Sequence, residues 1–311
     1  HRLWGRGLQP YAFQEVLASD WIASLTKFDD FHHYIVTFQD ELFECIARSA
    51  TWMIKEKMAM LEYFAPGRVA LGLGRGLARR EYDGFGIPMT EARGRFDEGA
   101  RMILDALDTG FCEGAGPLYK QPRVELRPRP LRGYRNDLYC VAMSPDSADA
   151  AAQLGGRMMT FIQHAFEKHI PMLEHYRACW RKHQPGREPL SPVLTDVTVL
   201  HEDAEEAQRL AYEHIGRHFM AVTSHYEFAG EHFKGIKGYE SYQKGADMMR
   251  AAGMDQSQKT YIEAQNYGTP KQVVEKYRER MEMIGEFNAM CVFSLGGLPF
   301  DKAQNSMKLF A

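Results

Sequence analysis

The sequence predicts an α/β fold in which helices cover a parallel sheet. From residue 67 onward, short apolar segments alternate with amphipathic helical segments, which is typical of parallel strands joined by helical crossovers. The chain has 311 residues, a length at which one large α/β unit is common. Because no linker or internal repeat divides the sequence, we expect residues 1–311 to form a single domain.

Strands are expected wherever apolar residues follow one another without helical spacing. The expected strands are 68–74 (RVALGLG), 137–143 (DLYCVAM), 157–162 (RMMTFI), 192–201 (PVLTDVTVLH) and 288–295 (NAMCVFSL), with a further strand at 260–266 (TYIEAQN). Their apolar character indicates strands buried on both faces of a sheet.

Helices are expected between these strands, at 90–107, 144–155, 166–183 and 268–285. In the second of these, Ser144 would cap the start, Pro145 would take the first position and Gly155 would end the helix. Residues 268–285 begin in the same way, with a threonine cap followed by proline.

Two long segments interrupt this alternation. Residues 110–136 are rich in Pro, Gly and Arg and predict a loop or hairpin. Residues 224–258 form a second insertion, and such insertions build the mouth of a site or are disordered. The first 66 residues lack full helices between their apolar segments, and Ser19 and Ala50 are plausible junctions where segments are absent.

Composition excludes several classes of protein. A net charge of −3 and a pI near 6.5 argue against nucleic acid or an anionic membrane as the main partner. No stretch reaches the about 18 apolar residues that span a bilayer, and no secretory signal is visible at the start. The five cysteines are scattered and form no CxxC pair, which indicates a reducing cytoplasm.

The segment GRVALGLGRGLARREYDGFG (67–86) is the first candidate for a binding site. It lacks the GK[ST] of a phosphate-binding P-loop, and it is a weak dinucleotide fingerprint. Arg75 and Arg93 lie on either side of a loop between a strand end and the next helix, where α/β barrels keep their sites. The alternative is a glycine-rich strand end that merely turns.

A second candidate is MSPDSADAA, in which Ser144, Ser147 and the free N–H groups of a helix start could hold a phosphate. The alternative is that the two serines only cap the helix. Taken together, the two segments predict a phosphate-bearing cofactor held by guanidinium groups and a helix N-terminus.

Several segments resemble the bacterial luciferase-like flavin monooxygenases in one collinear order over about residues 52–311. They are GRVALGLGRGLARREYDGFG with ARGRFDE, then CVAMSPDSADAAAQLG, GTPKQVVEKY and NSMKLF. The resemblance implies a (β/α)8 TIM barrel with insertions, in which the N-terminal strands are poorly represented. It also implies reduced FMN (FMNH2) bound at the carboxyl ends of the strands.

The resemblance assigns cofactor-binding roles residue by residue. Arg75 and Leu77 would contact the flavin, Arg93 would reach its phosphate, Val141 and Met143 would line the isoalloxazine and ribityl chain, and Ser144 and Ser147 would bind the phosphate.

The sequence departs from the family at some of these places. Gly74 stands where the luciferase α subunit has a cysteine, and Met143 stands where it has a glutamate. The place of the family's histidine pair is taken by SLTKF (24–28). His32 and His33 follow shortly afterwards and are the candidates for the catalytic acid/base.

The resemblance implies that O2 adds to the flavin C4a to give a peroxyflavin, which oxidises an aldehyde, a ketone or an activated carbon. Because no nicotinamide motif is seen, a separate flavin reductase would supply FMNH2, and a homo-oligomer is expected. The alternatives are an F420-dependent oxidoreductase and a non-catalytic flavin-binding protein of the same fold. We expect no metal site, since His214 and His218 lack an evident third ligand.

Overall fold

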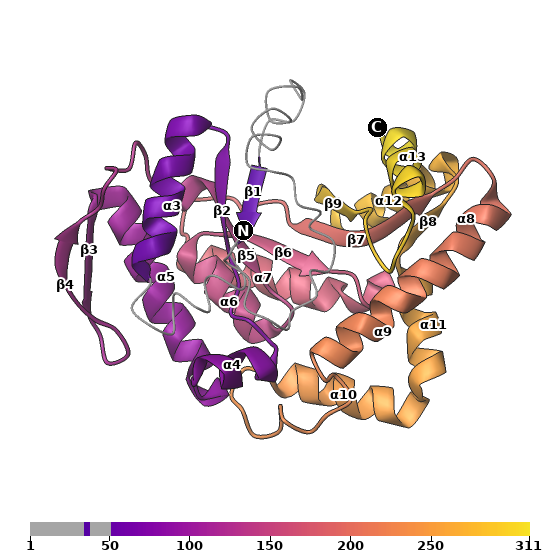
Figure 1. Cartoon of the computed structure of the whole chain (residues 1–311), viewed down its shortest axis with the longest axis horizontal. Coiled ribbons are helices and arrows are strands. Elements are labelled where there is room, and N and C mark those ends of the chain that lie inside the picture. Colours follow the sequence, from indigo (N-terminus) through magenta and orange to yellow (C-terminus); the bar gives the residue numbers. More distant parts are fainter. Residues whose placement is uncertain (1–33, 38–50) are drawn as a thin grey trace.

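A seven-stranded parallel sheet lies at the centre of the molecule (Figure 1). The computed structural model describes residues 34–37 and 51–311. The strands of this sheet are β1 (Tyr34–Thr37), β2 (Val69–Leu73), β5 (Leu138–Val141), β6 (Arg157–Phe161), β7 (Val193–Leu200), β8 (Asn266–Gly268) and β9 (Asn288–Val292). They run in the order β1-β2-β5-β6-β7, and β7 then pairs with both remaining strands.

The long strand β7 has two partners along one edge. Its residues 193–197 pair with β9, and its residues 198–200 pair with β8. Every residue of β7 and of β2 is buried. Such continuous burial is the mark of a parallel sheet covered on both faces, so the predicted α/β class is confirmed.

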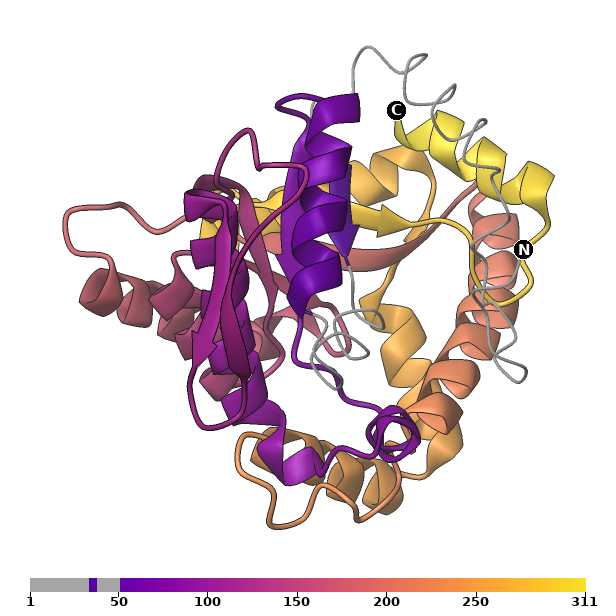
Figure 2. The same cartoon turned by 60° about the vertical axis from the view of Figure 1, so that its left-hand side comes forward.

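Helices surround the sheet in Figures 1 and 2. They are α3 (Thr51–Phe64), α4 (Arg79–Phe85), α5 (Ala92–Thr109), α6 (Pro145–Leu154), α7 (Ile170–His183), α8 (Ala204–Leu210), α9 (Gly216–His225), α10 (Glu240–Ala252), α11 (Met254–Ala264), α12 (Pro270–Ile284) and α13 (Phe300–Phe310). Short turns are η1 (Met89–Glu91), η2 (Arg135–Asp137), η3 (Phe166–Lys168) and the π-helical η4 (Ala211–Ile215). In the described part of the chain, none of these helices has the length and apolar character needed to cross a membrane.

The largest apolar cluster joins β2, β5 and β6 to α5, α6 and α7. Ala148, Ala151 and Ala152 on α6 are small, which lets α7 approach closely. Trp180 on α7 is fully buried, and its indole nitrogen donates to the carbonyl of Arg187 at 3.0 Å. Each large apolar side chain buried in this cluster contributes about 1.5–3 kcal/mol relative to exposure, so the cluster fixes the strand ends that carry the candidate site.

The helix starts predicted from local sequence are confirmed. The hydroxyl of Ser144 caps α6 by accepting from the backbone N–H of Ser147 at 3.2 Å, and Gly155 ends that helix with φ 70°. Thr269 forms a capping box with Gln272 at the start of α12. These signals act over three residues and therefore need no tertiary contact.

The strand expected at 260–266 is wrong. Residues 260–264 continue α11, whose buried face includes Ile262 and Ala264, and β8 begins only at Asn266. The five other expected strands are confirmed within one residue at the N-terminal end and within three at the C-terminal end. A short apolar segment has no periodicity that separates a strand from a buried helix turn.

Both interrupting segments have regular structure. Residues 110–136 contain an antiparallel hairpin of β3 (Phe111–Ala115) and β4 (Lys120–Glu125), which packs against α5. Residues 224–258 hold a loop, α10 and the start of α11. The expectations for Ser19 and Ala50, and most of the first 66 residues, lie outside the described residues. The expectation that the first 66 residues lack full helices is wrong for Thr51–Phe64, which form α3 between β1 and β2.

Candidate functional site

The glycine-rich segment after β2 leads the chain out of the sheet toward α4. A Cβ on Gly74 would lie 3.6 Å from the Val141 side chain, so the ends of β2 and β5 approach closely here. Gly76 has φ 81°, a left-handed conformation that favours glycine. The turn therefore places Arg75 at the carboxyl edge of the parallel sheet, where α/β proteins bind ligands.

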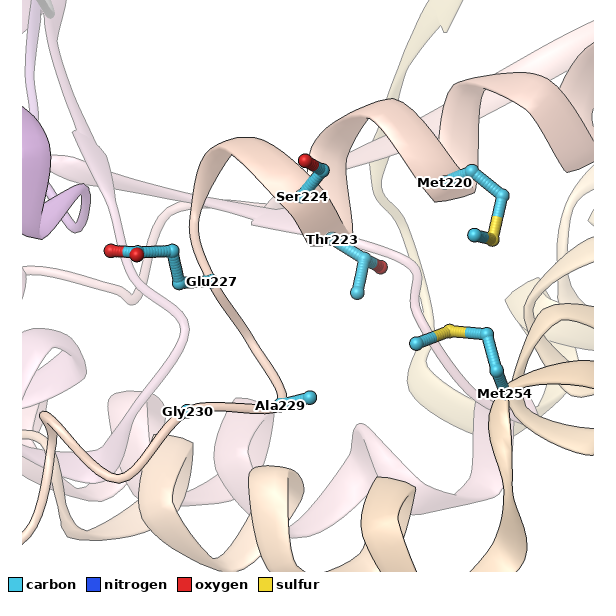
Figure 3. A pocket seen from close by; sticks show the side chains of 7 residues that line it. All are labelled: Met220, Thr223, Ser224, Glu227, Ala229, Gly230 and Met254. Carbon is cyan, nitrogen blue, oxygen red and sulfur yellow. The ribbon is translucent and has the colours of Figure 1, made fainter.

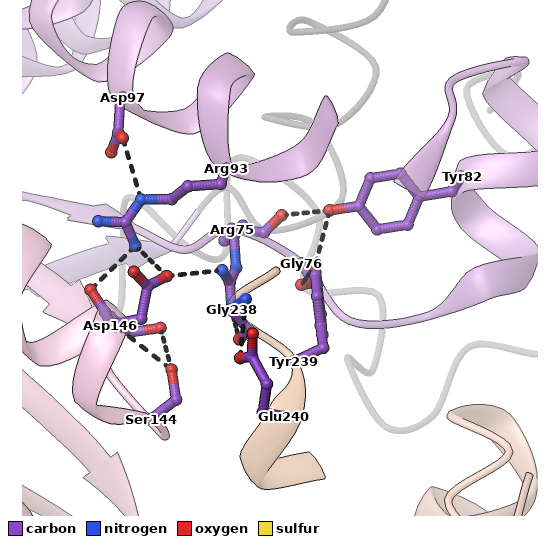
Figure 4. A network of polar contacts seen from close by, with 11 residues as sticks. Arg75, Gly76, Tyr82, Arg93, Asp97, Ser144, Asp146, Gly238, Tyr239 and Glu240 are labelled. Carbon is purple, nitrogen blue, oxygen red and sulfur yellow. Dashed lines mark hydrogen bonds and ion pairs between the residues drawn. The ribbon is translucent and has the colours of Figure 1, made fainter. Parts of the chain in front are cut away.

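Arg75 lies at the centre of a polar network (Figure 4). Its Nη2 donates to the carbonyl of Gly238 at 2.7 Å, and its Nη1 donates to Asp146 Oδ2 at 3.2 Å. Its guanidinium carbon lies 4.3 Å from the centroid of the Tyr239 ring. Only 7% of the side chain is exposed, so these contacts fix its position.

Arg93, on α5, reaches the same carboxylate from a second direction. Its Nη1 donates to Asp146 Oδ2 at 2.8 Å and to the Asp146 carbonyl at 2.9 Å. Its Nε donates to Asp97 Oδ2 at 2.9 Å, one turn along the helix. The two arginines that the sequence predicts as phosphate ligands therefore converge on one anionic group.

That anionic group belongs to the first turn of α6. Asp146 follows the cap residue Ser144 by two positions, and Ser147 follows immediately. The two serine hydroxyls lie 2.9 Å apart and are hydrogen-bonded to each other. The hydrogen bond from the Ser147 N–H shows that Ser144 caps the helix. Phosphate binding by Ser144 and Ser147 stays a prediction.

The donor set suits a phosphate. The Asp146 carboxylate stands between Arg75 and Arg93 and so shows that an oxyanion fits between their guanidinium groups. The N-terminus of α6 adds the positive end of its dipole, although the N–H groups of Ser147 and Ala148 already bond to the hydroxyl and carbonyl of Ser144. A flavin phosphate needs these same donors, and the residues present fit such a group.

Two tyrosines complete the network. Tyr82 donates to the carbonyl of Arg75 at 2.9 Å, Tyr239 donates to the carbonyl of Gly76 at 3.1 Å, and the two hydroxyls lie 3.1 Å apart. Burial is the largest cause that raises the pKa of both hydroxyls, so both stay protonated and able to donate. Sequence reasoning missed Asp146, Tyr82, Gly238 and Tyr239.

The partners from the 224–258 insertion could not have been found from local sequence. Gly238 and Tyr239 are 163 residues from their partners Arg75 and Gly76. Asp146 did carry a signal, since a carboxylate stands between the two serines of the predicted phosphate segment. The insertion thus contacts the chain just after β2, and its expected role at the mouth of a site stays a prediction.

Leu77 and Met143, which are expected to contact the flavin, pack against different parts of the protein. Leu77 packs in a small apolar cluster with Tyr82 and Phe233. The Met143 sulfur accepts from Thr160 Oγ1 at 3.3 Å and from the Phe161 N–H at 3.2 Å, so this side chain lies against β6. Leu77, Val141 and Met143 all follow or end strands of the sheet, and their contact with a flavin stays a prediction.

The predicted acid/base residues His32 and His33 lie outside the described residues. Among the described histidines, His164 and His169 follow β6, with ring centroids 6.4 Å apart. Burial, followed by the nearby charges of His164 and Arg280, lowers the pKa of His169 to about 4. His169 is therefore neutral at pH 7.

The described part of the chain contains no group of three His, Cys, Asp or Glu side chains placed to hold a metal ion. His214 Nδ1 instead lies 3.1 Å from the carbonyl of Gly296. Burial lowers the pKa of His218, which packs beside Tyr261. His214 and His218 thus each contact neighbouring protein groups, the Gly296 carbonyl and the Tyr261 ring.

A pocket of about 310 Å³ lies between the end of α9, the following loop and the start of α11 (Figure 3). Met220 and Met254 form two of its walls, and Glu227 stands at the loop. Both carboxylate oxygens of Glu227 accept from Arg79, at 2.8 and 3.1 Å. Its charge is therefore neutralised, and the pocket suits an uncharged molecule. The residues that line it are Met220, Thr223, Ser224, Glu227, Ala229, Gly230 and Met254.

Comparison with known proteins connects this architecture to one family. The family model described as luciferase-like monooxygenase matches residues 50–286. The alkanal monooxygenase alpha chain of Photorhabdus laumondii is 24% identical over 260 residues, which are 82% of this chain and 71% of that relative. The corresponding alpha chain of Aliivibrio fischeri is 23% identical over 261 residues, which are 82% of this chain and 72% of the relative.

Two solved structures share the fold. The oxygenating constituent of 3,6-diketocamphane monooxygenase of Pseudomonas putida, a type II Baeyer–Villiger monooxygenase in complex with FMN, aligns with a TM-score of 0.64 and 13% identity, over 96% of this chain and 94% of that one. The coenzyme F420-dependent tetrahydromethanopterin reductase of Methanopyrus kandleri aligns with a TM-score of 0.57 and 16% identity, over 82% and 76%. These likenesses, with the family match, confirm the barrel-type fold class expected from the sequence.

Proposed function

Because this chain belongs to the luciferase-like monooxygenase family, we propose that it is a flavin-dependent monooxygenase that uses reduced FMN and O2. The observation that carries the proposal is the convergence of Arg75 and Arg93 at the start of α6. Two largely buried guanidinium groups beside a helix N-terminus suit the phosphate of FMN. The FMN complex of the diketocamphane enzyme supports this choice of cofactor.

The roles of the residues follow from their positions. Arg75 and Arg93 would hold the phosphate, and Ser144 and Ser147 would add their hydroxyls and the adjacent N–H groups. Reduced flavin, when bound, supplies the electrons that activate O2. The loop around Gly238 covers the arginines and so limits the access of water to the phosphate.

The remaining assignments are also part of the proposal. Leu77, Val141 and Met143 would contact the flavin, and His32 or His33 would move the proton. A separate reductase would supply FMNH2, and the protein would act as a homo-oligomer. The names of the relatives, alkanal monooxygenase and Baeyer–Villiger monooxygenase, support an aldehyde or a ketone as the substrate class.

The phosphate assignment predicts a difference between FMN and riboflavin. Arg75→Ala should weaken binding of reduced FMN about ten- to a hundred-fold, because one charge-assisted hydrogen bond contributes about 1.5–3 kcal/mol. Riboflavin has no phosphate, so its affinity should change little. Anaerobic titration of both flavins measures this difference.

Arg79→Ala is the matched control. Arg79 is an arginine of the same segment, but its side chain is 43% exposed and pairs with Glu227. It should leave the affinity ratio of the two flavins unchanged. Equal losses of FMN and riboflavin in Arg75→Ala would contradict the assignment.

A second candidate is an F420-dependent oxidoreductase, which the likeness to an F420-dependent reductase favours. Oxygen uptake separates the two. With FMNH2 and a panel of aldehydes and ketones, a monooxygenase consumes O2 in step with substrate oxidation. Binding of F420 with hydride transfer and no O2 uptake would favour the second candidate. Flavin binding without either reaction would indicate a non-catalytic flavoprotein.

A further inference from the structure

The carboxylate of Asp146 occupies the position at which a phosphate would meet the arginines. Its Oδ2 accepts from Arg93 Nη1 at 2.8 Å and from Arg75 Nη1 at 3.2 Å (Figure 4). Among the described residues, Asp146 is the one carboxylate that contacts both arginines, since Asp97 contacts Arg93. The contact is therefore one that a bound phosphate has to share or replace.

The four side chains joined by these ion pairs carry no net charge. Arg75 and Arg93 bring two positive charges, and Asp97 and Asp146 bring two negative ones. A phosphate monoester adds a charge of about −1.5 to −2 at pH 7. It meets repulsion from Asp146 at close range, in surroundings where the two guanidinium groups are only 7% and 15% exposed and charges are poorly screened.

Asp146 is more exposed to solvent than the two arginines that it contacts. Its side chain is 34% exposed, whereas both arginines are largely buried. Arg75 stays fixed by the Gly238 carbonyl and the Tyr239 ring when the carboxylate leaves. Arg75 is thus held by contacts that do not involve Asp146, and the Asp146 carboxylate is the more solvent-accessible partner of both ion pairs.

We propose that Asp146 competes with the flavin phosphate for Arg75 and Arg93 and thereby speeds release of the flavin. This inference rests on the proposed binding of a flavin phosphate at this position. A flavin that travels between the chain and a separate reductase has to dissociate after each turnover. A carboxylate that reclaims both guanidinium groups favours that dissociation.

Asp146→Asn tests the competition. Asparagine keeps the shape of the side chain and an oxygen that can accept from the arginines, but it removes the charge. We expect the Kd of FMN to fall about ten- to a hundred-fold, as for one charge-assisted hydrogen bond. Most of the change should lie in the dissociation rate, measured by stopped-flow flavin fluorescence. Riboflavin should bind as it does to the parent protein.

Asp97→Asn is the matched control. It removes an equal charge from the Nε side of Arg93, but Asp97 makes no contact with Arg75. A change in general electrostatics would tighten FMN to a similar extent in both variants, and that outcome would overturn the competition. The melting temperature of each variant verifies that the fold is retained.

The outcomes separate this inference from the proposed function. If the parent protein binds FMN and riboflavin with equal affinity, the phosphate assignment fails, and the competition fails with it. If the parent prefers FMN, but Asp146→Asn binds FMN no more tightly and releases it no more slowly, only the competition is overturned. A selective gain for FMN in Asp146→Asn supports both.

Discussion

The side chains of the candidate site are held by backbone groups that are distant in sequence. Arg75 is fixed by the carbonyl of Gly238, 163 residues further along the chain. The sequence pattern could suggest Arg75 and Arg93, because Arg75 follows a strand end and Arg93 lies at the start of the helix expected at 90–107. It could not show that they share the carboxylate of Asp146, since that contact depends on how α5 and α6 approach each other.

At the same scale, His169 gives the protein a pH-dependent stability. Burial lowers its pKa from 6.5 to about 4 in the folded state. Between these two values the unfolded chain binds more protons than the folded one, so stability rises with pH across this window. The free energy of unfolding does not suffer from His169 above pH 6.5. It falls progressively toward pH 4, by roughly 3 kcal/mol in all.

The measurement is urea unfolding at a series of pH values, with His169→Gln as the comparison. Glutamine keeps a side-chain acceptor for the N–H of Gln163, which lies 3.4 Å from His169 Nε2. It does not titrate, so the variant should lose less stability between pH 6.5 and 4 than the parent. Parallel pH curves for the two proteins would show that His169 does not carry the effect.

At the scale of elements, the local sequence predicted where helices start. It did not predict which segment packs over the candidate site. The caps at Ser144 and Thr269 follow from neighbouring residues. The strand expected at 260–266 failed because α11 extends to Ala264, and its length is set by packing against α9 and α10. The position of the loop before α10 is known only from the contacts of Gly238 and Tyr239 with the chain just after β2.

That loop depends on Gly238, which has φ 85°. A Cβ there would lie 2.4 Å from Arg75 Nη1 and 2.6 Å from Asp146 Oδ2, closer than atoms can approach. Gly238→Ala should therefore displace the arginine and weaken FMN binding, in addition to a cost of about 1 kcal/mol for the left-handed conformation. Anaerobic flavin titration and thermal unfolding measure the two effects.

Gly235→Ala separates strain from displacement. Gly235 lies in the same loop with φ 77°, and nothing stands within 4 Å of the position of its Cβ. Both variants pay the conformational cost, but only Gly238→Ala should change flavin affinity. If the two variants bind FMN alike, the loop has no part in holding Arg75.

At the scale of the whole molecule, a buried ion pair joins β7 of the central sheet to α12. Both oxygens of Asp196 on β7 accept from Arg280 on α12, at 2.7 and 2.9 Å. The side chains are 0% and 2% exposed. Arg280→Met should destabilise the protein by about 3–5 kcal/mol, because it leaves an uncompensated buried carboxylate.

Replacing both partners provides the control. The double variant Asp196→Val and Arg280→Met buries no charge and should recover much of the lost stability in chemical unfolding. Arg278→Ala, on the exposed side of the same helix, should cost about 0–1 kcal/mol. A double variant as unstable as Arg280→Met would show that packing, and not the unpaired charge, causes the loss.

The sequence by itself determined the α/β class, five of the strands, the helix caps and the family, because these depend on apolar runs, residues a few positions apart and collinear motifs. It also predicted that Arg75, Arg93, Ser144 and Ser147 bind one phosphate-bearing cofactor, which stays a prediction. Only the tertiary structure decided that β7 pairs with both β8 and β9 and that the insertion covers the arginines. It alone showed that Asp146 stands between them. Such contacts join residues far apart in the chain, and their energies depend on distance and burial in the folded state, which no local pattern encodes.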